Sequence, residues 1–452
     1  MKKIYLDWNI INHIEESPEL FDFIKNHQSY FVFVYSPAHF ADLMRSVKPG
    51  ETNVYLNDDT EKLATICETH LLKFSDNKLN VYNCYPQEFL EKEGKDYPLI
   101  ENFASLDNFK NSLNFDGMDL YSMFSDKLKE TSFGETIAHP LFGSFSNVLE
   151  FFECLMNFMD RFLQDKIVSK EIRDKIKENT KYSEFDNINE KAPNEVINYI
   201  NSSLAKYGVD GDIVDIVKKI ASENVKGDDM FVFKAVYLSL HFMNYHSDKR
   251  NLWNIMTDAE HAFYGSFCDV LVTNDSKMKL KTEALYSYFN KQTKVIAKEE
   301  FFDYLQKEIS KEFDFKDHIE ELLTNQNIPD NQPKDSVYVK WKHVDTFLWG
   351  FFNRIEFHKH LDDGKICFYL CRDTKYEECF FYSEIEKFFN IIRSLIIDNN
   401  VLEHFDIDYV NKYQQHDYSA DFAFYVNDNV LVVLQINEDG RSPLPCMFIT
   451  LV

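Results

Sequence analysis

Two short apolar runs in the sequence lead into aspartates that could bind a metal ion. Residues 4–6 (IYL) are followed at once by Asp7, and residues 270–273 (VLVT) are followed two positions later by Asp275. Their length and their β-branched and aromatic residues predict buried strands. Ligands of an open parallel sheet bind outside the carboxyl ends of its strands. Two carboxylates brought there can share a hard cation, which would suit metal-assisted hydrolysis.

Two further acids occupy positions from which they can converge on the same edge. Asp42 lies in the second turn of a helix predicted to begin after Ser36 as its N-cap. Asp258 follows Thr257, and Thr257 with Glu260 forms a capping-box pattern that predicts a helix from about here to residue 267. These acids therefore complete a set of four candidate ligands.

Each of these acids also has a purely structural interpretation. Asp7 and Asp275 can cap the helices that follow them, Asp258 can interact with a helix dipole, and Asp42 can lie on a solvated helix face. His261 is one helical turn after Asp258, and packing is the favoured interpretation for it. The sequence leaves these alternatives open.

The composition limits the class of protein. A chain of 452 residues exceeds one hydrophobic core, and 44% hydrophobic residues exclude a largely disordered chain. The net charge of −26 opposes non-specific adhesion to nucleic acid. It does not exclude a nuclease, because bound divalent cations reverse the local field at a carboxylate cluster.

Targeting and redox signals favour a reducing compartment. The eight cysteines form no CxxC pair, so buried free thiols are expected. The amino-terminal residues lack a signal-peptide core, and no apolar stretch is long enough to span a bilayer. We therefore expect a cytoplasmic location and no membrane partner.

Changes in pattern along the chain predict several segments. Residues 1–84 and 228–308 alternate strands and helices and should form one discontinuous α/β domain. Residues 85–227 have helical spacing and are interpreted as a helical insertion. Residues 309–334 are predicted to be a helix and a polar linker, and residues 335–452 a small α+β domain. In that domain, residues 338–357 and 382–397 are expected to be helical.

The chain resembles the PIN-domain family of metal-dependent nucleases over roughly residues 1–84 and 228–308. The resemblance rests on the segments IYLDWN (residues 4–9), SPAHFADL (36–43), DAEH (258–261) and DVLVTND (269–275). It implies a three-layer α/β/α fold with a parallel sheet and an acidic pocket for Mg²⁺ or Mn²⁺. The family hydrolyses phosphodiesters, usually in RNA.

The resemblance also assigns roles to individual residues. The metal-ligand positions fall on Asp7, Asp42, Asp258 and Asp275. Supporting polar positions fall on Asn9 and Thr273, and Asp269, at the start of the second acidic strand, is a weaker supporting candidate. Two features depart from the family pattern: Asp42 stands where Glu is commoner, and the insertion is not part of the minimal fold.

The function expected from this resemblance is a metal-dependent endoribonuclease, with a role in stress response or phage defence by analogy alone. Lys277, Lys279 and Lys281, with Lys234 and Arg250 nearby, can guide a phosphate backbone, although a solvated helix face also explains them. One alternative is a catalytically inactive PIN-like scaffold whose carboxyl-terminal domain binds a protein partner. Another is a DNA-cleaving nuclease. The insertion or the last domain can also mediate homo-oligomer or partner contacts.

Overall fold

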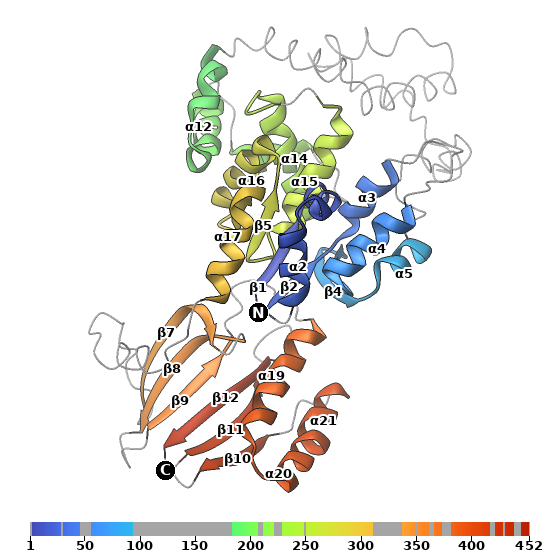
Figure 1. Ribbon diagram of the computed structural model, residues 1–452. Coiled ribbons are helices and arrows are strands. Elements are labelled where there is room, and N and C mark those ends of the chain that lie inside the picture. The colour runs from blue at the N-terminus through green and yellow to red at the C-terminus, as the bar shows by residue number, and fades with distance from the viewer. Residues whose placement is uncertain are drawn as a thin grey trace, which may run out of the picture.

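The structure of the chain is a computed structural model, shown in Figure 1. Its description covers residues 2–28, 30–45, 56–93, 183–206, 211–220, 228–247, 250–310, 337–348, 351–360, 366–372, 381–415, 421–427, 430–437 and 444–451. The predicted linker at residues 325–334 and most of the predicted helical insertion lie outside the described residues.

Strands from both ends of the first region form one parallel sheet. Its order is β2 (Phe31–Val34), β1 (Lys2–Leu6), β5 (Val270–Thr273) and β6 (Lys294–Ala297), and all three pairings are parallel. The expectation of an α/β arrangement with a parallel sheet is confirmed. Because β1 and β5 are neighbours, the residues that follow them leave the sheet at the same edge.

Alternating side chains of this sheet enter two different hydrophobic clusters. Tyr5 and Leu271 belong to one cluster, whereas Ile4, Leu6 and Val272 belong to the other. Successive strand residues point to opposite faces, so helices cover both faces of the sheet. The helices that contribute to the first cluster include α12 (Pro193–Lys206), α13 (Ile213–Ile220), α14 (Asp229–Phe242), α15 (Leu252–Gly265) and α16 (Ser276–Tyr288). Those that contribute to the second include α1 (Trp8–Asn12), α2 (Pro18–Asn26), α3 (Pro37–Arg45), α4 (Leu56–Cys67), α5 (Pro86–Lys92) and α17 (Lys298–Ile309).

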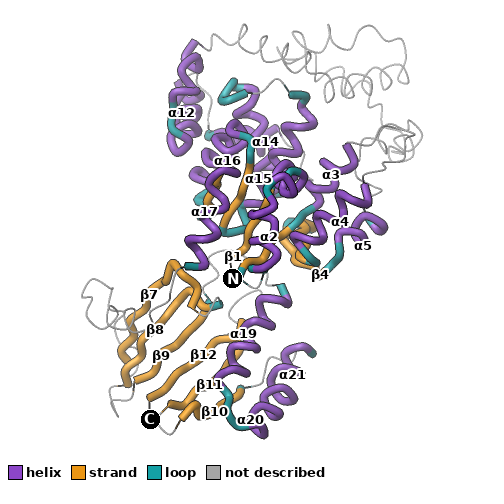
Figure 2. The backbone as a smooth tube through the Cα atoms, viewed as in Figure 1, coloured by secondary structure: helices purple, strands orange, loops and turns teal. Residues whose placement is uncertain are grey.

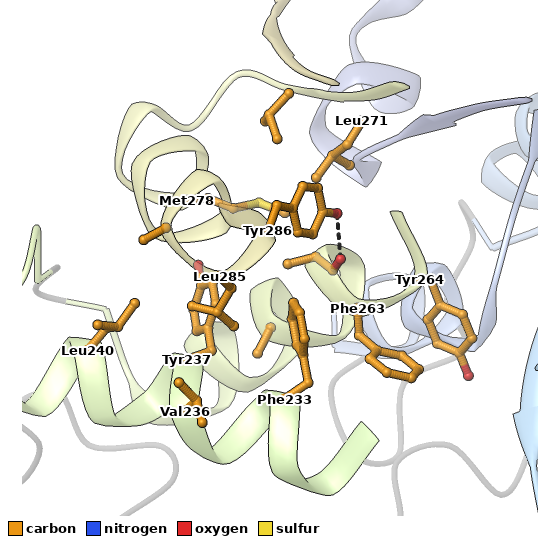
Figure 3. Close-up of a cluster of buried hydrophobic side chains, with 14 of the residues drawn as sticks. Phe233, Val236, Tyr237, Leu240, Phe263, Tyr264, Leu271, Met278, Leu285 and Tyr286 are labelled. Atoms are coloured by element: carbon orange, nitrogen blue, oxygen red, sulfur yellow. Dashed lines mark hydrogen bonds between the residues drawn. The ribbon is translucent and has the colours of Figure 1, made fainter. Parts of the chain in front are cut away.

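Figure 3 shows how the first cluster holds α14, α15 and α16 together. Phe233 and Tyr237 of α14 are buried among Phe263 of α15 and Leu285 of α16. Full burial of each such side chain stabilises the fold by about 1.5–3 kcal/mol. The buried Tyr286 hydroxyl donates to the carbonyl oxygen of Ala262 at 2.6 Å, so this large side chain has a partner for its polar end. The packing fixes α15 against the sheet.

A small antiparallel hairpin lies beside the parallel sheet. It pairs β3 (His70–Ser75) with β4 (Lys78–Asn83). The preceding helix, α4, ends at Cys67. Glu68 has a positive φ of 50°, which ends the helix, and Asp76 and Asn77 adopt φ values of 52° and 57° in the hairpin turn. Asp and Asn tolerate this left-handed conformation well.

The carboxyl-terminal region forms a six-stranded sheet, visible in Figure 2, whose pairings are all antiparallel. Its order is β10 (Phe422–Asn427), β11 (Val430–Asn437), β12 (Leu444–Leu451), β9 (Ile366–Cys371), β8 (Phe352–His360) and β7 (Val337–Leu348). Helix α19 (Tyr382–Leu395) packs on it through Phe388, Phe389 and Ile392. The shorter elements α20 (Asn399–His404), η5 (Phe405–Val410) and α21 (Asn411–Gln414) follow α19 in the chain.

The helix expected over residues 338–357 was wrong, because this segment forms β7 and the first part of β8. Val337, Val339 and Trp341 alternate with other residues at a period of two, and β-branched and aromatic residues favour strands. Pairing with β8 and β9 decides the conformation, and local spacing alone does not reveal that pairing.

The start of α19 joins the two sheets at the amino end of β1. The buried Glu384 carboxylate contacts Lys3 Nζ at 3.5 Å and Arg372 Nη2 at 2.9 Å. His70 Nε2 lies 2.9 Å from Ser383 Oγ, and Phe381 belongs to the first hydrophobic cluster. Figure 1 places the amino terminus at this junction. The carboxyl-terminal region therefore contacts the parallel sheet at the amino end of β1, opposite the end at which Asp7 lies.

None of the helices in the described ranges is long and apolar enough to cross a membrane.

Candidate metal centre

Asp7 lies at the carboxyl end of β1, and its carboxylate does not cap the helix that follows. Its backbone N–H donates to Val272 O at 2.9 Å, which ties it to β5. Asp7 is the N-cap residue of α1, yet its side chain makes no capping hydrogen bond. Instead, Oδ2 accepts from Thr273 Oγ1 at 2.9 Å and from Asn9 Nδ2 at 3.4 Å. The predicted supporting residues Thr273 and Asn9 thus both contact Asp7.

Asp42 and His261 meet Asp7 from two different helices. Asp42 is on α3 and His261 on α15, and their ligand atoms and that of Asp7 all lie within 4.8 Å of one another. His261 Nε2 lies 2.8 Å from Asp42 Oδ2. All three residues are buried. We call this set, Asp7, Asp42 and His261, the acid–imidazole centre.

A chain of hydrogen bonds orients His261 from behind. Its Nδ1 atom lies 2.8 Å from the Tyr5 hydroxyl, which in turn lies 2.6 Å from Ser36 Oγ. His39 is adjacent: its Nδ1 accepts from Ser36 N–H at 3.1 Å, so Nε2 carries the proton and donates to Leu6 O at 2.8 Å. The imidazole of His261 is therefore held with Nε2 facing the two carboxylates.

The electrostatics of the centre reflect burial and two like charges. Burial raises the pKa of Asp7, and the nearby Asp42 raises it further, while His261 opposes the shift. Burial alone would lower the pKa of His261, but the hydrogen bond and charge of Asp42 reverse this and raise the pKa. Burial lowers the pKa of His39 to about 3, helped by the charge of His261. His39 is therefore uncharged at neutral pH. His261 is the histidine that contacts an acid of the centre, Asp42.

Asp258 lies in the middle of α15, so the prediction that it opens a helix was wrong. The helix begins six residues earlier, after Asn251, whose side chain accepts from Asn254 N–H at 3.0 Å. Thr257 Oγ1 donates to Trp253 O at 3.1 Å, as an internal helical residue does. Leucine and isoleucine packing extends the helix beyond the local capping pattern. The change leaves Asp258 buried on the same helix as His261.

Arg250 binds Asp258 and Asp275 together. Its Nη2 atom lies 2.5 Å from Asp258 Oδ2 and 2.8 Å from Asp275 Oδ2. Burial raises the pKa of Asp258 to about 7 although Arg250 and Lys281 oppose the shift. Neither Asp258 nor Asp275 belongs to the acid–imidazole centre among the residues that the structure describes. The four predicted ligands are thus divided into two pairs.

Asp275 and Asp269 have clear structural roles. Asp275 is the N-cap of α16, and its Oδ1 accepts from the backbone N–H of Lys277 and of Met278, at 2.8 and 2.9 Å. Asp269 Oδ2 accepts from Lys3 N–H at 2.7 Å, before the start of β5. Asp269 therefore lies at the edge of the sheet opposite Asp7, and its contacts join strands instead of supporting the centre.

The lysines of α16 do not form one exposed basic surface. Lys281 is fully buried, with Nζ 4.9 Å from the centre of the Tyr237 ring. Lys277 Nζ donates to Ser247 O at 2.8 Å, and Lys279 Nζ contacts Glu300 at 3.4 Å. Lys234, from α14, pairs with Glu260. The sequence could not show this, because helical spacing alone does not reveal which face of α16 is covered.

An open hollow of about 780 Å³ lies next to the same sheet edge. Asn274, between the end of β5 and Asp275, contributes to its wall, together with the starts of α2 and α17. Its lining consists of Ser17, Pro18, Glu19, Leu20, Asn274, Lys298, Glu299 and Phe302. The centre residues themselves do not line it.

The donor atoms of the acid–imidazole centre fit a divalent cation. Two carboxylates supply hard oxygen ligands, and a neutral His261 with its proton on Nδ1 presents the Nε2 lone pair. In that tautomer Nδ1–H donates to the Tyr5 oxygen and the Tyr5 hydroxyl donates to Ser36; metal-binding histidines are commonly held by such a hydrogen bond from the second ring nitrogen. An imidazole ligand suits Mn²⁺ and other transition metals better than Mg²⁺.

Comparisons of the chain with protein-family models, with curated proteins and with solved structures find no match. The function must therefore be argued from the site.

Proposed function

We propose that the protein is a metal-dependent nuclease with a PIN-like fold that hydrolyses phosphodiester bonds, with RNA as the favoured substrate. The observation that carries the proposal is the convergence of Asp7, Asp42 and His261 from a strand end and two helices. The parallel sheet and the helices on both of its faces agree with the three layers that such a fold requires.

The charges of the centre favour a bound cation. The ligand atoms of two buried carboxylates and one imidazole lie within 4.8 Å of one another, and burial raises the pKa of Asp7. Buried like charges are costly unless a counter-ion compensates them. A divalent cation supplies that compensation and, when bound, can position a phosphate and lower the pKa of the attacking water.

The residues around the centre would hold the ligands of that cation in place. Thr273 and Asn9 fix Asp7 through Oδ2. The Tyr5 hydroxyl fixes the ring of His261. Asp7 is therefore assigned as a ligand of the cation, with its carboxylate held in place by Thr273 and Asn9.

The test is a cleavage assay with a matched inactive variant. We expect the purified chain with Mn²⁺ to cleave single-stranded RNA, and single-stranded DNA more slowly. EDTA and the substitution Asp7→Asn should each reduce the rate by at least about 100-fold, beyond the range for second-shell changes. Asp22→Asn, an exposed acid on α2, is the control. Cleavage that survives both EDTA and Asp7→Asn would overturn the proposal.

A second candidate, the catalytically inactive PIN-like scaffold, is favoured by one observation: Arg250 already neutralises Asp258 and Asp275. If this candidate is correct, the wild-type chain will cleave neither RNA nor DNA with any divalent ion. The cleavage assay separates the two. A role in stress response or phage defence, and a cytoplasmic location, stay expectations of the family analogy.

A further inference from the structure

We propose that Cys371 and Cys446 form a thiol pair that closes reversibly to a disulfide across the two central strands of the carboxyl-terminal sheet. The cysteines lie on β9 and β12, which pair antiparallel. Both are free thiols in the structure. This site of modification goes beyond the proposed nuclease activity, and it does not depend on the metal centre.

The register of the two strands places the cysteines opposite one another. The pairing of β12 with β9 advances one residue at a time until it reaches Met447 and Leu370. The next position in the same antiparallel register joins the residue before Met447 to the residue after Leu370, which are Cys446 and Cys371. Both cysteines are still inside the sheet there, because each pairs with the strand on its other side, β11 or β8.

The spacing of opposed residues suits a disulfide. Residues directly opposite one another in an antiparallel pair have Cα atoms about 4.5 or 5.5 Å apart, and disulfides join Cα atoms about 4.4–6.8 Å apart. Opposed side chains also point to the same face of the sheet, as a bridge between them requires. Cys371 and Cys446 can therefore form the bond without a rearrangement of the strands.

Tyr369 provides independent evidence that the two thiols are near one another. Its partner on β12 is Phe448, and the centres of the two rings are 4.5 Å apart. Burial raises the pKa of Tyr369 most, followed by Cys446, which is its hydrogen-bond partner, and then by Cys371. Both sulfur atoms therefore lie close to the hydroxyl of this one side chain.

The two thiols differ in exposure, which sets the order of the chemistry. Cys371 is partly exposed, whereas Cys446 is 3% exposed, so a small disulfide such as oxidised glutathione reaches Cys371 first. The Cys371 thiolate attacks one glutathione sulfur and releases the other glutathione as a thiolate. The Cys446 thiolate then attacks the Cys371 sulfur of the mixed disulfide and releases the second glutathione. The chain gives up two electrons, and the two thiol protons pass to the two reduced glutathiones.

Cys367 is a matched control on the same strand. It lies four residues before Cys371, so it is on the same face of β9, and it is buried. Its partner on β12, however, is Thr450, which has no sulfur. The register therefore predicts that Cys371 bonds to a second cysteine and that Cys367 does not.

The experiment maps the disulfides of the folded, full chain after oxidation with oxidised glutathione. Peptide mass spectrometry should find one intramolecular disulfide, between Cys371 and Cys446, and dithiothreitol should reverse it. Cys367→Ala should form the same bond. Cys446→Ala should form no intramolecular bond and should keep glutathione on Cys371.

A second measurement asks whether the bond fits the native fold. The disulfide closes a long loop that contains α19, and such a loop restricts the unfolded chain. The oxidised wild type should therefore unfold at a higher urea concentration than the reduced chain, and Cys446→Ala should show no such rise. Three results would overturn the inference: both thiols staying free, either one bonding to a different cysteine, or an oxidised chain that unfolds at lower urea. A bond that forms only after unfolding in urea would overturn it as well.

Discussion

The two ends of strand β1 each bury a cluster of charged side chains, and the clusters differ in how they are balanced. At the amino end, Glu384 lies between Lys3 and Arg372, so a carboxylate is surrounded by cations of the chain itself. At the carboxyl end, Asp7 and Asp42 share the imidazole of His261. The first cluster pairs one acid with two cations and joins two sheets. The second brings together two carboxylates and an imidazole, which are donor groups that suit a cation.

Arg250 with Asp258 and Asp275 provides a third cluster of charged side chains for this comparison. It lies close enough to the centre for the charge of Asp7 to act on Asp258, yet it is balanced as the amino-end cluster is. The four acids that the sequence motifs singled out therefore do not share one role. The cations that the fold places beside each acid decide whether that acid serves stability or function.

The largest expected effect is on stability, at the balanced amino end. Glu384→Gln leaves the buried Lys3 and Arg372 without their shared carboxylate, and breaking such a buried pair costs about 3–5 kcal/mol. Urea unfolding at pH 7 should show this loss. Glu386→Gln, exposed on the same helix, is the control. Mn²⁺ binding by the folded variant should not change, and a loss of less than 1 kcal/mol would contradict the assignment.

The same substitution has a predictable dependence on pH. Burial would raise the pKa of Glu384, but Lys3 and Arg372 outweigh it and hold the pKa below its ordinary value of 4.5. The stability that ionised Glu384 contributes is present above that value and is lost as pH falls through the lower folded-state pKa. The unfolding free energies of wild type and Glu384→Gln should therefore differ fully at pH 7 and converge in acid.

The next largest effect is on the affinity for a metal ion, at the carboxyl end of β1. Asp42→Asn removes one of the two carboxylates of the centre, and we expect Mn²⁺ affinity to fall by at least about 100-fold, beyond the range for second-shell changes. Calorimetric titration would measure this fall. Asp275→Asn is the matched comparison and should retain affinity. Equal losses in the two variants would show that the four acids act as one site.

A smaller loss should follow from the residue behind His261. Tyr5→Phe removes the hydroxyl that holds Nδ1, and loss of a group that orients a metal ligand costs about 10–100-fold in metal affinity. Tyr35→Phe also removes a buried hydroxyl, which donates to Cys84 O, but it lies outside the centre. An affinity loss confined to Tyr5→Phe supports a positioning role. Equal behaviour of the two variants would reduce Tyr5 to a packing residue.

The smallest expected effect has the opposite sign to that of Glu384→Gln. In EDTA, Asp7→Asn relieves the repulsion with Asp42 and the cost of a buried charge, so the metal-free protein should become more stable by about 1 kcal/mol. Asparagine can still accept from Thr273 at the same position. Urea unfolding in EDTA measures the gain, with Asp22→Asn as the control. A clear destabilisation would mean that Asp7 is a structural residue.

Local patterns in the sequence were enough to predict the elements around the site. The two apolar runs predicted β1 and β5, and Ser36 with Pro37 predicted the start of α3 close to where it lies. These signals are local, because a strand depends on the alternation of a few residues and a helix start on its first turn. Asp7 and Asp42, which the motifs singled out, do lie together.

The tertiary structure alone decided which partners each acid has. Asp42 and His261 are 219 residues apart in the chain, so no local pattern could place their side chains 2.8 Å from one another. The sequence likewise does not show whether the side chains of Arg250 and Lys281 face solvent or the acids. Only the packing of α15 and α16 against the sheet turns them toward Asp258. Proximity fixes electrostatic energy, and proximity here is a property of the fold.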